Sequence, residues 1–369
     1  MSIVNQEAGG RSPLARLLRW FAPYGKRAVD PDPVVPGTSA GTTAPPILTP
    51  LEIEFGGHHL DFFSLRSEDL RHSPNGRHLS VVTTESKILL FDVDVTGDRM
   101  RAEFLTAFAS ADLEAPHGID WIDDEHVVVA NRRAGLAFFR LPRANRWEPE
   151  TPLEAISKAQ PHWFGAPRET RMLGARKIVT GAGSVRKFGD HLYVSSNKAN
   201  TVTRHRILPG PSCDEGTLVA QEGINIPDSA VPSPDGIWLA VGDHNNARVL
   251  IFRLGEDAPV AELRDPNLLH PHGLAFDPSG TALISADAGG RSLHVFHAPD
   301  GDWSQDRTCS HSRVEGVAAS VFERVQTETP ESVRDLEGGT KGVDVAPDGR
   351  TVLTTCRGQT LRAFRLDVA

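Results

Sequence analysis

The chain has 369 residues, a formal net charge of −9 and only three cysteines, Cys213, Cys309 and Cys356. An acidic balance without basic runs argues against nucleic acid as a partner, and three widely spaced cysteines offer neither a disulfide framework nor a metal-ligand spacing. No apolar run reaches the length that spans a membrane, and the first residues lack the apolar core of a secretory signal. We therefore expect a cytoplasmic protein.

Residues 1–50 are predicted to be a tail outside the folded domain. Apolar residues at positions 14, 17, 18 and 21 follow Ser12 and Pro13 at helical spacing, which predicts a short amphipathic helix. Residues 11–27 hold five basic residues and no acid, so this helix either packs on its own domain or docks to a protein partner or a membrane surface. The Pro-rich residues 30–50 are predicted to be a stiff linker.

Residues 51–369 contain one unit of short strands and turns that recurs along the chain. Copies begin, in order, at Glu68, Pro116, Gly183, Ile226, His270 and Gly339. In the copy HPHGLAFDPSGTALISADAGGRSLHVFHA, three apolar runs are separated by Gly- and Asp-rich turns, as in antiparallel strands. Pro234 and Pro278 occupy equivalent places 44 residues apart, a period typical of four strands. The sequence therefore predicts an all-β fold, a six-bladed β-propeller with four-stranded blades.

Two stretches exceed the repeat and are predicted insertions, at about residues 143–180 and 299–338. The first carries Trp147, His162, Trp163 and Phe164, which either cover a binding mouth or pack on a blade edge. Within the second, part of the run of residues 317–325 is expected to supply the outer strand of the fifth blade. The last copy has only three strands, so an N-terminal strand at residues 51–55 (LEIEF) is expected to complete it and close the ring.

The first strand of each blade should line the central channel, so equivalent residues of different copies should converge on the axis. The position just before or at the start of this strand is occupied in turn by Glu68, His117, Gly183, Asp228, His272 and Lys341. Two imidazoles, two carboxylates and an ammonium would then surround one mouth. We predict a divalent metal ion held by Glu68, His117, Asp228 and His272; imidazoles favour Zn, Fe or Mn, whereas oxygen ligands alone suit Ca or Mg. The alternative is an inert, solvated channel end.

A second predicted ring comes from the ends of the second strands, which open on the same face. Its members are Glu85, Asn131, Asn197, Asp243, Asp287 and Cys356. These side chains could hydrogen-bond a hydroxylated or anionic substrate, but Asn and Asp are also the residues that tight turns prefer. Cys356 is expected to be a buried core residue, because no His-paired cysteine motif surrounds it.

The segments SEDLRHSPNG, IPDSAVPSPDG and HPHGLAFDPSG resemble the gluconolactonase, regucalcin (senescence marker protein) and strictosidine-synthase-like group of six-bladed propellers. The resemblance implies a metal-binding Glu at Glu68, with Asp228 and His272 at the places of the family's Asn and Asp. His272 departs from that pattern, which puts Ca²⁺ and a sugar-lactone activity in doubt. The resemblance covers the architecture of residues 51–369, and its motifs are shared by many propellers.

These observations favour a metal-assisted, lactonase-like hydrolase that acts on a small metabolite at the channel mouth. Glu68, Asp228 and His272 would hold the cation, with His117 as a fourth ligand or proton carrier, and Lys341 would stabilise the developing oxyanion. Catalytic roles are thus expected for His117, Asp228 and Lys341. One alternative is a non-catalytic propeller that recruits protein partners, also through residues 11–27; another is metal-free acid/base chemistry by Glu68 or Asp228.

Overall fold

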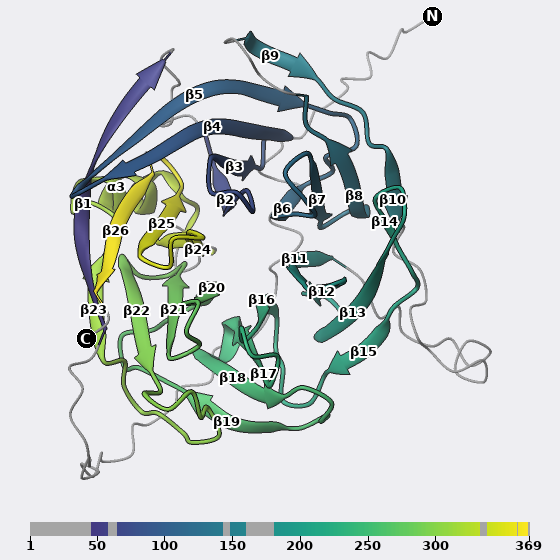
Figure 1. Ribbon diagram of the computed structural model, residues 1–369. Helices are drawn as coiled ribbons and strands as arrows, with labels where there is room; N and C mark the ends of the chain where they lie inside the picture. Colours follow the sequence, from purple (N-terminus) through teal and green to yellow (C-terminus); the bar gives the residue numbers. More distant parts are fainter. Residues whose placement is uncertain are drawn as a thin grey trace, which may run out of the picture.

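The described residues form an all-β ring of small sheets around a central axis, as in a propeller (Figure 1). The computed structural model describes residues 46–57, 65–142, 148–159, 181–332, 338–359 and 361–367. The predicted tail helix, the partner-docking residues 11–27 and the aromatic residues of the first insertion lie outside these ranges. Within them, no helix is long and apolar enough to cross a lipid bilayer.

One strand from each repeat copy lies next to the axis. Each of these inner strands contacts the next one around the ring, and the last contacts the first (Figure 1). They are β2 (Ser67–His72), β6 (Pro116–Trp121), β11 (Ala182–Phe188), β16 (Pro227–Pro232), β20 (Pro271–Phe276) and β24 (Thr340–Val345).

In four of the sheets, the remaining strands continue outward from the inner strand in antiparallel order. Three sheets have four strands each: β6 with β7 (His126–Asn131), β8 (Gly135–Arg140) and β10 (Ser157–Ala159); β16 with β17 (Trp238–Asp243), β18 (Arg248–Arg253) and β19 (Pro259–Leu263); and β20 with β21 (Ala282–Asp287), β22 (Ser292–His297) and β23 (Ser312–Glu315). A five-stranded sheet contains β11, β12 (His191–Ser196), β13 (Thr201–Leu208), β14 (Ser212–Cys213) and β15 (Thr217–Ala220).

The first and last repeat units share one nine-stranded sheet. It follows the order β2, β3 (His78–Thr83), β4 (Lys87–Thr96), β5 (Arg99–Ala109), β1 (Ile47–Gly57), β26 (Arg362–Asp367), β25 (Thr351–Cys356) and β24, with β9 (Glu148–Pro152) beside β5. The described strands therefore form five hydrogen-bonded sheets rather than the six separate ones expected from the repeat.

Strand β1 is the reason that two units merge. Its first half runs antiparallel to β26, with Ile47 opposite Asp367 and Leu51 opposite Ala363, and its second half runs parallel to β5. An N-terminal strand does complete the last unit, but residues 47–51 do this rather than the predicted residues 51–55. Residues 52–57 do not take part because they pair with β5 instead.

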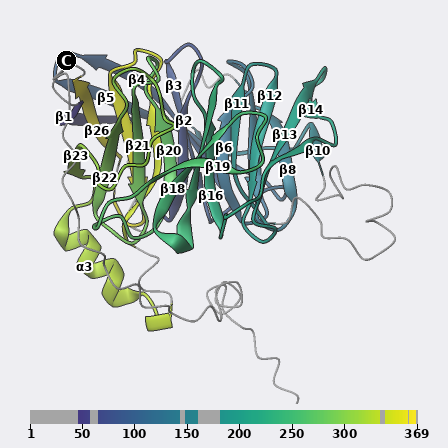
Figure 2. The ribbon, with the colours of Figure 1, turned by 90° about the horizontal axis from the view of Figure 1, so that it is seen from below.

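Residues 317–325 do not form the expected outer strand of the fifth unit. That strand is β23, and the helix α3 (Ala319–Glu328) follows it. Val321, Phe322 and Val325 recur at helical spacing, and Val325 is buried against the ring. Arg324 donates a hydrogen bond to the Gly358 carbonyl at 2.8 Å, which fixes α3 at one face of the ring (Figure 2).

The core lies between neighbouring sheets. Two residues after each predicted channel position stands an apolar residue with no exposed surface: Leu70, Ile119, Val185, Ala230, Leu274 and Val343. These side chains join clusters whose members come from adjacent units, as where Ile119 meets Val82 and Ile88. Because side chains alternate along a strand, the neighbouring positions are left to face the axis. Packing between sheets thus sets which residues line the channel.

Candidate metal centre

A β-bulge near its start interrupts each inner strand at the predicted channel position. The pairing with the second strand shifts there in every unit, and the residues passed over include Glu68, His117, Gly183, Asp228, His272 and Lys341. A bulge leaves one residue outside the ladder and can re-aim its side chain. These six residues, here called the bulge ring, are therefore the ones that local backbone geometry frees to turn towards the axis.

Three members of the bulge ring bring donor atoms together. His117 Nε2 lies 3.3 Å from Glu68 Oε2 and 3.2 Å from His272 Nε2, and His272 Nε2 lies 3.8 Å from Glu68 Oε2. The three residues are at most 3% exposed. Ligand atoms at about 2.0–2.1 Å from a tetrahedral ion lie roughly 3.3 Å from one another, so the triangle has the size of one face of such a site. The cluster could hold a divalent cation.

The backbone of the third unit orients one of these imidazoles. His117 Nδ1 lies 2.5 Å from the Gly183 carbonyl oxygen, so an N–H at Nδ1 donates to it and leaves the Nε2 lone pair directed at the triangle. The third unit has glycine here because a Cβ at Gly183 would clash with the Asn197 side chain. This unit therefore contributes a carbonyl oxygen, not a side chain, to the centre.

The Glu68 carboxylate is ionised. Burial alone would raise its pKa, but the nearby charges of Arg66, Lys341 and His117 hold the pKa well below its usual value. Arg66 Nε stands 2.8 Å from Glu68 Oε1, and Lys341 Nζ stands 3.5 Å from Oε2. Among the described residues, neither Glu68 oxygen accepts a well-directed hydrogen bond. This ionised carboxylate therefore has lone pairs that could coordinate a metal ion.

The second imidazole is held in the form that binds metals. Burial lowers the pKa of His272 well below its usual value, with the charges of Lys341 and His117 acting in the same direction. A neutral imidazole keeps the lone pair that coordination requires. Two imidazole nitrogens and one anionic oxygen form a donor set typical of Zn²⁺, Fe²⁺ or Mn²⁺ and less typical of Ca²⁺.

Asp228, the fourth predicted ligand, lies outside the triangle. Its Oδ2 is 2.8 Å from His244 Nδ1, while its Oδ1 is 3.2 Å from the Arg132 guanidinium and also accepts from the Asn197 amide. Burial would raise the pKa of Asp228, but His244, followed by His272 and Arg132, lowers it well below its usual value. Asp228 and His244 thus form a carboxylate–imidazole pair beside the metal ligands.

Most side chains of the second predicted ring accept hydrogen bonds from the backbone of nearby turns. Asn131 accepts from the Glu114 backbone N–H, Asp243 from that of Asn225, and Asp287 from those of Leu269 and His270. Burial raises the pKa of the Cys356 thiol to about 12, as expected of a core residue rather than a nucleophile. Asn197 is the exception, since its amide donates to Asp228.

Arg66 is a site residue that sequence reasoning missed. It stands two residues before Glu68, outside the repeated motif, but alternate residues of an extended segment share one face. Its backbone N–H donates to Glu85, which fixes the start of the segment next to the second strand's end. Counting back two residues from the motif would have placed a cation beside the predicted carboxylate.

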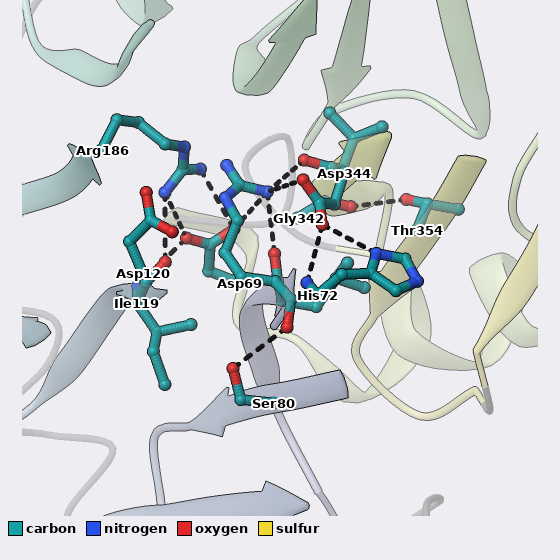
Figure 3. Close-up of polar contacts among 12 residues, drawn as sticks. Asp69, His72, Ser80, Ile119, Asp120, Arg186, Gly342, Asp344 and Thr354 are labelled. Atoms are coloured by element: carbon teal, nitrogen blue, oxygen red, sulfur yellow. Dashed lines mark hydrogen bonds and ion pairs between the residues drawn. The ribbon is translucent and has the colours of Figure 1, made fainter. Parts of the chain in front are cut away.

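Beyond the bulge ring, ion pairs between inner strands lie across the channel. Arg186 donates to both oxygens of Asp69, at 2.9 and 3.2 Å, and Arg71 NH1 lies 3.4 Å from Asp344 Oδ1. Figure 3 shows Asp69 between Arg186 and Asp344. All of these come from inner strands, so the candidate metal centre and the opposite end of the axis are two separate regions.

Comparison with known proteins adds no relative. No family model matches the chain, and no curated protein matches it significantly. The resemblance to the gluconolactonase and regucalcin group therefore remains a prediction.

Proposed function

We propose that the ring is a six-bladed β-propeller in which the first and last blades are fused by β1. The nine-stranded sheet then counts as two blades, each with its own inner strand, β2 and β24. Support comes from the bulges, which recur once in each of the inner strands at the equivalent place. Residues 51–369, extended by the strand residues from 47 onward, would form this one domain.

We propose that the protein is a metal-assisted hydrolase that opens a small cyclic ester, as a lactonase does. The observation that carries this proposal is the triangle of Glu68 Oε2, His117 Nε2 and His272 Nε2, buried and of the size that one ion fills. A divalent cation held there would supply Lewis acidity towards the ester carbonyl. Zn²⁺, Fe²⁺ and Mn²⁺ are the ions that this donor set fits best.

Side chains around the candidate metal centre have the other catalytic and positioning roles. Lys341, with its Nζ 3.5 Å from Glu68 Oε2, is placed to stabilise negative charge that develops on the substrate oxygen. The Asp228 and His244 pair is placed to accept and return a proton, because a carboxylate 2.8 Å from Nδ1 stabilises the imidazolium form. Arg66 keeps Glu68 ionised and oriented.

Metal content is the first test. The purified full chain, incubated in turn with Zn²⁺, Mn²⁺ and Fe²⁺ and then desalted, should retain about one ion per chain by elemental analysis. His117→Ala and His272→Ala should retain less than about a tenth of that amount. His297→Gln, which removes a buried imidazole from β22 away from the axis, is the matched control and should bind as the wild type does.

Activity is the second test. A panel of five- and six-membered lactones, followed by acid release in a pH-stat, should show hydrolysis that depends on the retained ion. Lys341→Gln should lower kcat by about tenfold or more, as loss of one oxyanion donor does, with little change in KM. Wild-type protein that retains no ion, or that hydrolyses lactones equally well without one, would exclude the proposal.

A further inference from the structure

A cavity of ≈ 370 Å³ lies at the end of the axis opposite the bulge ring. Its floor is built by the residue three places after the bulge ring in every inner strand, here called the floor ring: Arg71, Asp120, Arg186, Val231, Ala275 and Asp344. Three residues of extended chain span roughly 10 Å, so the two rings are separate layers of one channel. The cavity falls within the size range of small-molecule sites.

The charges of this layer do not balance. Arg186 is held bidentately by Asp69, and Arg71 lies between Asp69 and Asp344 at 3.8 and 3.4 Å. Among the described residues, Asp120 accepts only backbone hydrogen bonds, from the next residue at 2.8 Å and from β11 at 2.7 Å. Three carboxylates thus face two guanidinium groups.

Two further basic side chains stand near this layer. His72 donates from Nδ1 to Asp344 at 2.9 Å, a bond that a neutral imidazole also makes. Lys187 borders the cavity but is exposed, so solvent screens its charge. Among the described residues, neither His72, which pairs with Asp344, nor Lys187 forms an ion pair with Asp120.

The uncompensated negative charge faces the cavity. The Arg71, Arg186 and Asp69 side chains are each 5% exposed, whereas Asp344 is 14% exposed and Asp120 is also partly exposed. Burial raises the pKa of Asp120 to about 7, and the charge of Asp344 adds to the effect, while Arg71 opposes it. Both Asp120 and Asp344 line the cavity. The two carboxylates are thus more accessible from the cavity than either guanidinium.

The opposite wall of the cavity is apolar and its mouth is rigid. Val231, Ala275 and Phe276 line that wall. Prolines of the turns after the inner strands form the rim, and three of them, Pro234, Pro278 and Pro347, each pack on a glycine of the next such turn. A Cβ at Gly349 would stand 3.1 Å from Pro278, one at Gly280 would stand 3.5 Å from Pro234, and one at Gly76 would stand 3.7 Å from Pro347. The cavity is thus a built feature of the repeat.

We propose that this cavity is a second binding site, one that takes an organic monocation. An alkylammonium or guanidinium group would lie against Asp120 and Asp344, with its carbon stem against Val231, Ala275 and Phe276. The site does not depend on the proposed metal function, because the ion pairs of Asp69 separate the two regions. A free amine and the basic side chain of a peptide share this chemistry, and they differ in whether a polypeptide backbone must also fit the mouth.

Calorimetric titration of the full chain tests this proposal. The probes are butylammonium chloride for the free amine and the capped tripeptides Ac-Gly-Lys-Gly-NH2 and Ac-Gly-Arg-Gly-NH2 for the basic side chain. Butanol and Ac-Gly-Gln-Gly-NH2 are their uncharged controls. Butylammonium or at least one basic peptide should bind, and the uncharged probes should bind at least about tenfold more weakly, as loss of a charge-assisted hydrogen bond requires.

Asp120→Asn keeps the side-chain shape and an acceptor for a backbone N–H, and should weaken cation binding by about tenfold or more. Asp92→Asn removes the same charge from the exposed pair with Arg77, 3.3 Å apart, and should leave binding unchanged. Binding of the peptides alone would assign a polypeptide ligand, and binding of butylammonium alone a small amine. The proposal is overturned if no cationic probe binds at about 10 mM, a concentration well above the Kd of even a weak complex, or if Asp120→Asn binds them as tightly as the wild type.

Discussion

The two ends of the channel use two different positions of the same repeat for opposite electrostatic purposes. In the bulge ring, the Glu68 carboxylate faces two cations and two imidazoles, and its pKa is lowered well below the usual value. In the floor ring, Asp120 and Asp344 share two guanidinium groups with the neighbouring Asp69, and burial raises the pKa of Asp120 to about 7. Burial is common to both ends, so the neighbouring charges decide which carboxylates stay ionised.

This contrast indicates which ligand each end can accept. The bulge ring presents an ionised carboxylate with lone pairs and two imidazole nitrogens, which suits a small dication. The floor ring presents carboxylates that lack enough positive partners, above guanidinium groups that already have theirs. It therefore suits a group that brings one positive charge. The following changes test this contrast, in order of the effect expected.

The largest effect on stability is expected for the buried ion pairs of Asp69, which lie between the two ends of the channel. Asp69→Asn should destabilise the fold by about 3 kcal/mol, because Arg186 and Arg71 would be left buried with too few negative partners. Chemical denaturation of the full chain measures this. Asp92→Asn, at the exposed pair with Arg77, should cost about 1 kcal/mol or less. If both variants lose the same free energy of unfolding, the ion pairs of Asp69 do not stabilise the ring.

Metal binding should stabilise only an intact bulge ring. At a Zn²⁺ concentration about 100-fold above its Kd, the wild type should gain about 2.7 kcal/mol of unfolding free energy. His272→Ala should gain almost none, whereas His297→Gln should gain as much as the wild type. Thermal unfolding with and without the ion gives the comparison. A gain that persists in His272→Ala would place the ion elsewhere.

The floor ring should make stability fall as the pH rises. The pKa of Asp120 is raised to about 7, above the value near 3.9 of an unfolded chain. The folded state therefore binds more protons between about pH 4 and 7, and stability is lost as the pH rises through that window. Asp120→Asn cannot ionise and should lack this loss of stability.

Denaturation curves at about pH 5 and about pH 8, on either side of most of that window, measure this effect. The wild type should lose more stability between the two pH values than Asp120→Asn does, while Asp92→Asn should follow the wild type. An Asp120→Asn curve parallel to that of the wild type would mean that Asp120 has an ordinary pKa and that the floor ring has no uncompensated charge.

The smallest effect concerns the competition between Lys341 and a metal ion for Glu68. Lys341→Gln removes a charge 3.5 Å from Glu68 Oε2 and should raise metal affinity by about threefold to tenfold, since repulsion from a nearby ammonium is worth about 1 kcal/mol or more. Lys187→Gln, at the other end of the channel, removes the same charge and should leave the affinity unchanged. Competition with a metal-binding dye provides both constants. Weaker binding by Lys341→Gln would indicate that Lys341 supports the ion instead.

Much of the bulge ring could be predicted from the sequence, because the repeat alone aligns its residues with one another. Glu68, His117 and His272 converge as expected from that alignment. Asp228 lies outside the triangle because its carboxylate pairs with His244, which follows the second strand of the same unit. A repeat alignment predicts which residues face the axis, but not which pairs form among them.

Other features depended on contacts that no local pattern reveals. The floor ring follows the bulge ring by three residues and could have been found by the same count, but the pairing of Asp69 with Arg186 joins residues 117 positions apart. The double pairing of β1 rests on competition between two partner strands, β5 and β26. Residues 317–325 satisfy both a strand-like apolar run and a helical spacing, and packing of Val325 on the ring selects the helix.

The proposed chemistry requires Glu68, His117 and His272 to bind one metal ion together. Anomalous diffraction from crystals of the Zn²⁺-loaded full chain, recorded on both sides of the zinc absorption edge, would locate that ion. We expect one strong peak about 2.0–2.2 Å from Glu68 Oε2, His117 Nε2 and His272 Nε2. A peak at Asp228 and His244 instead, or no peak on the axis at all, would contradict a metal centre at the bulge ring.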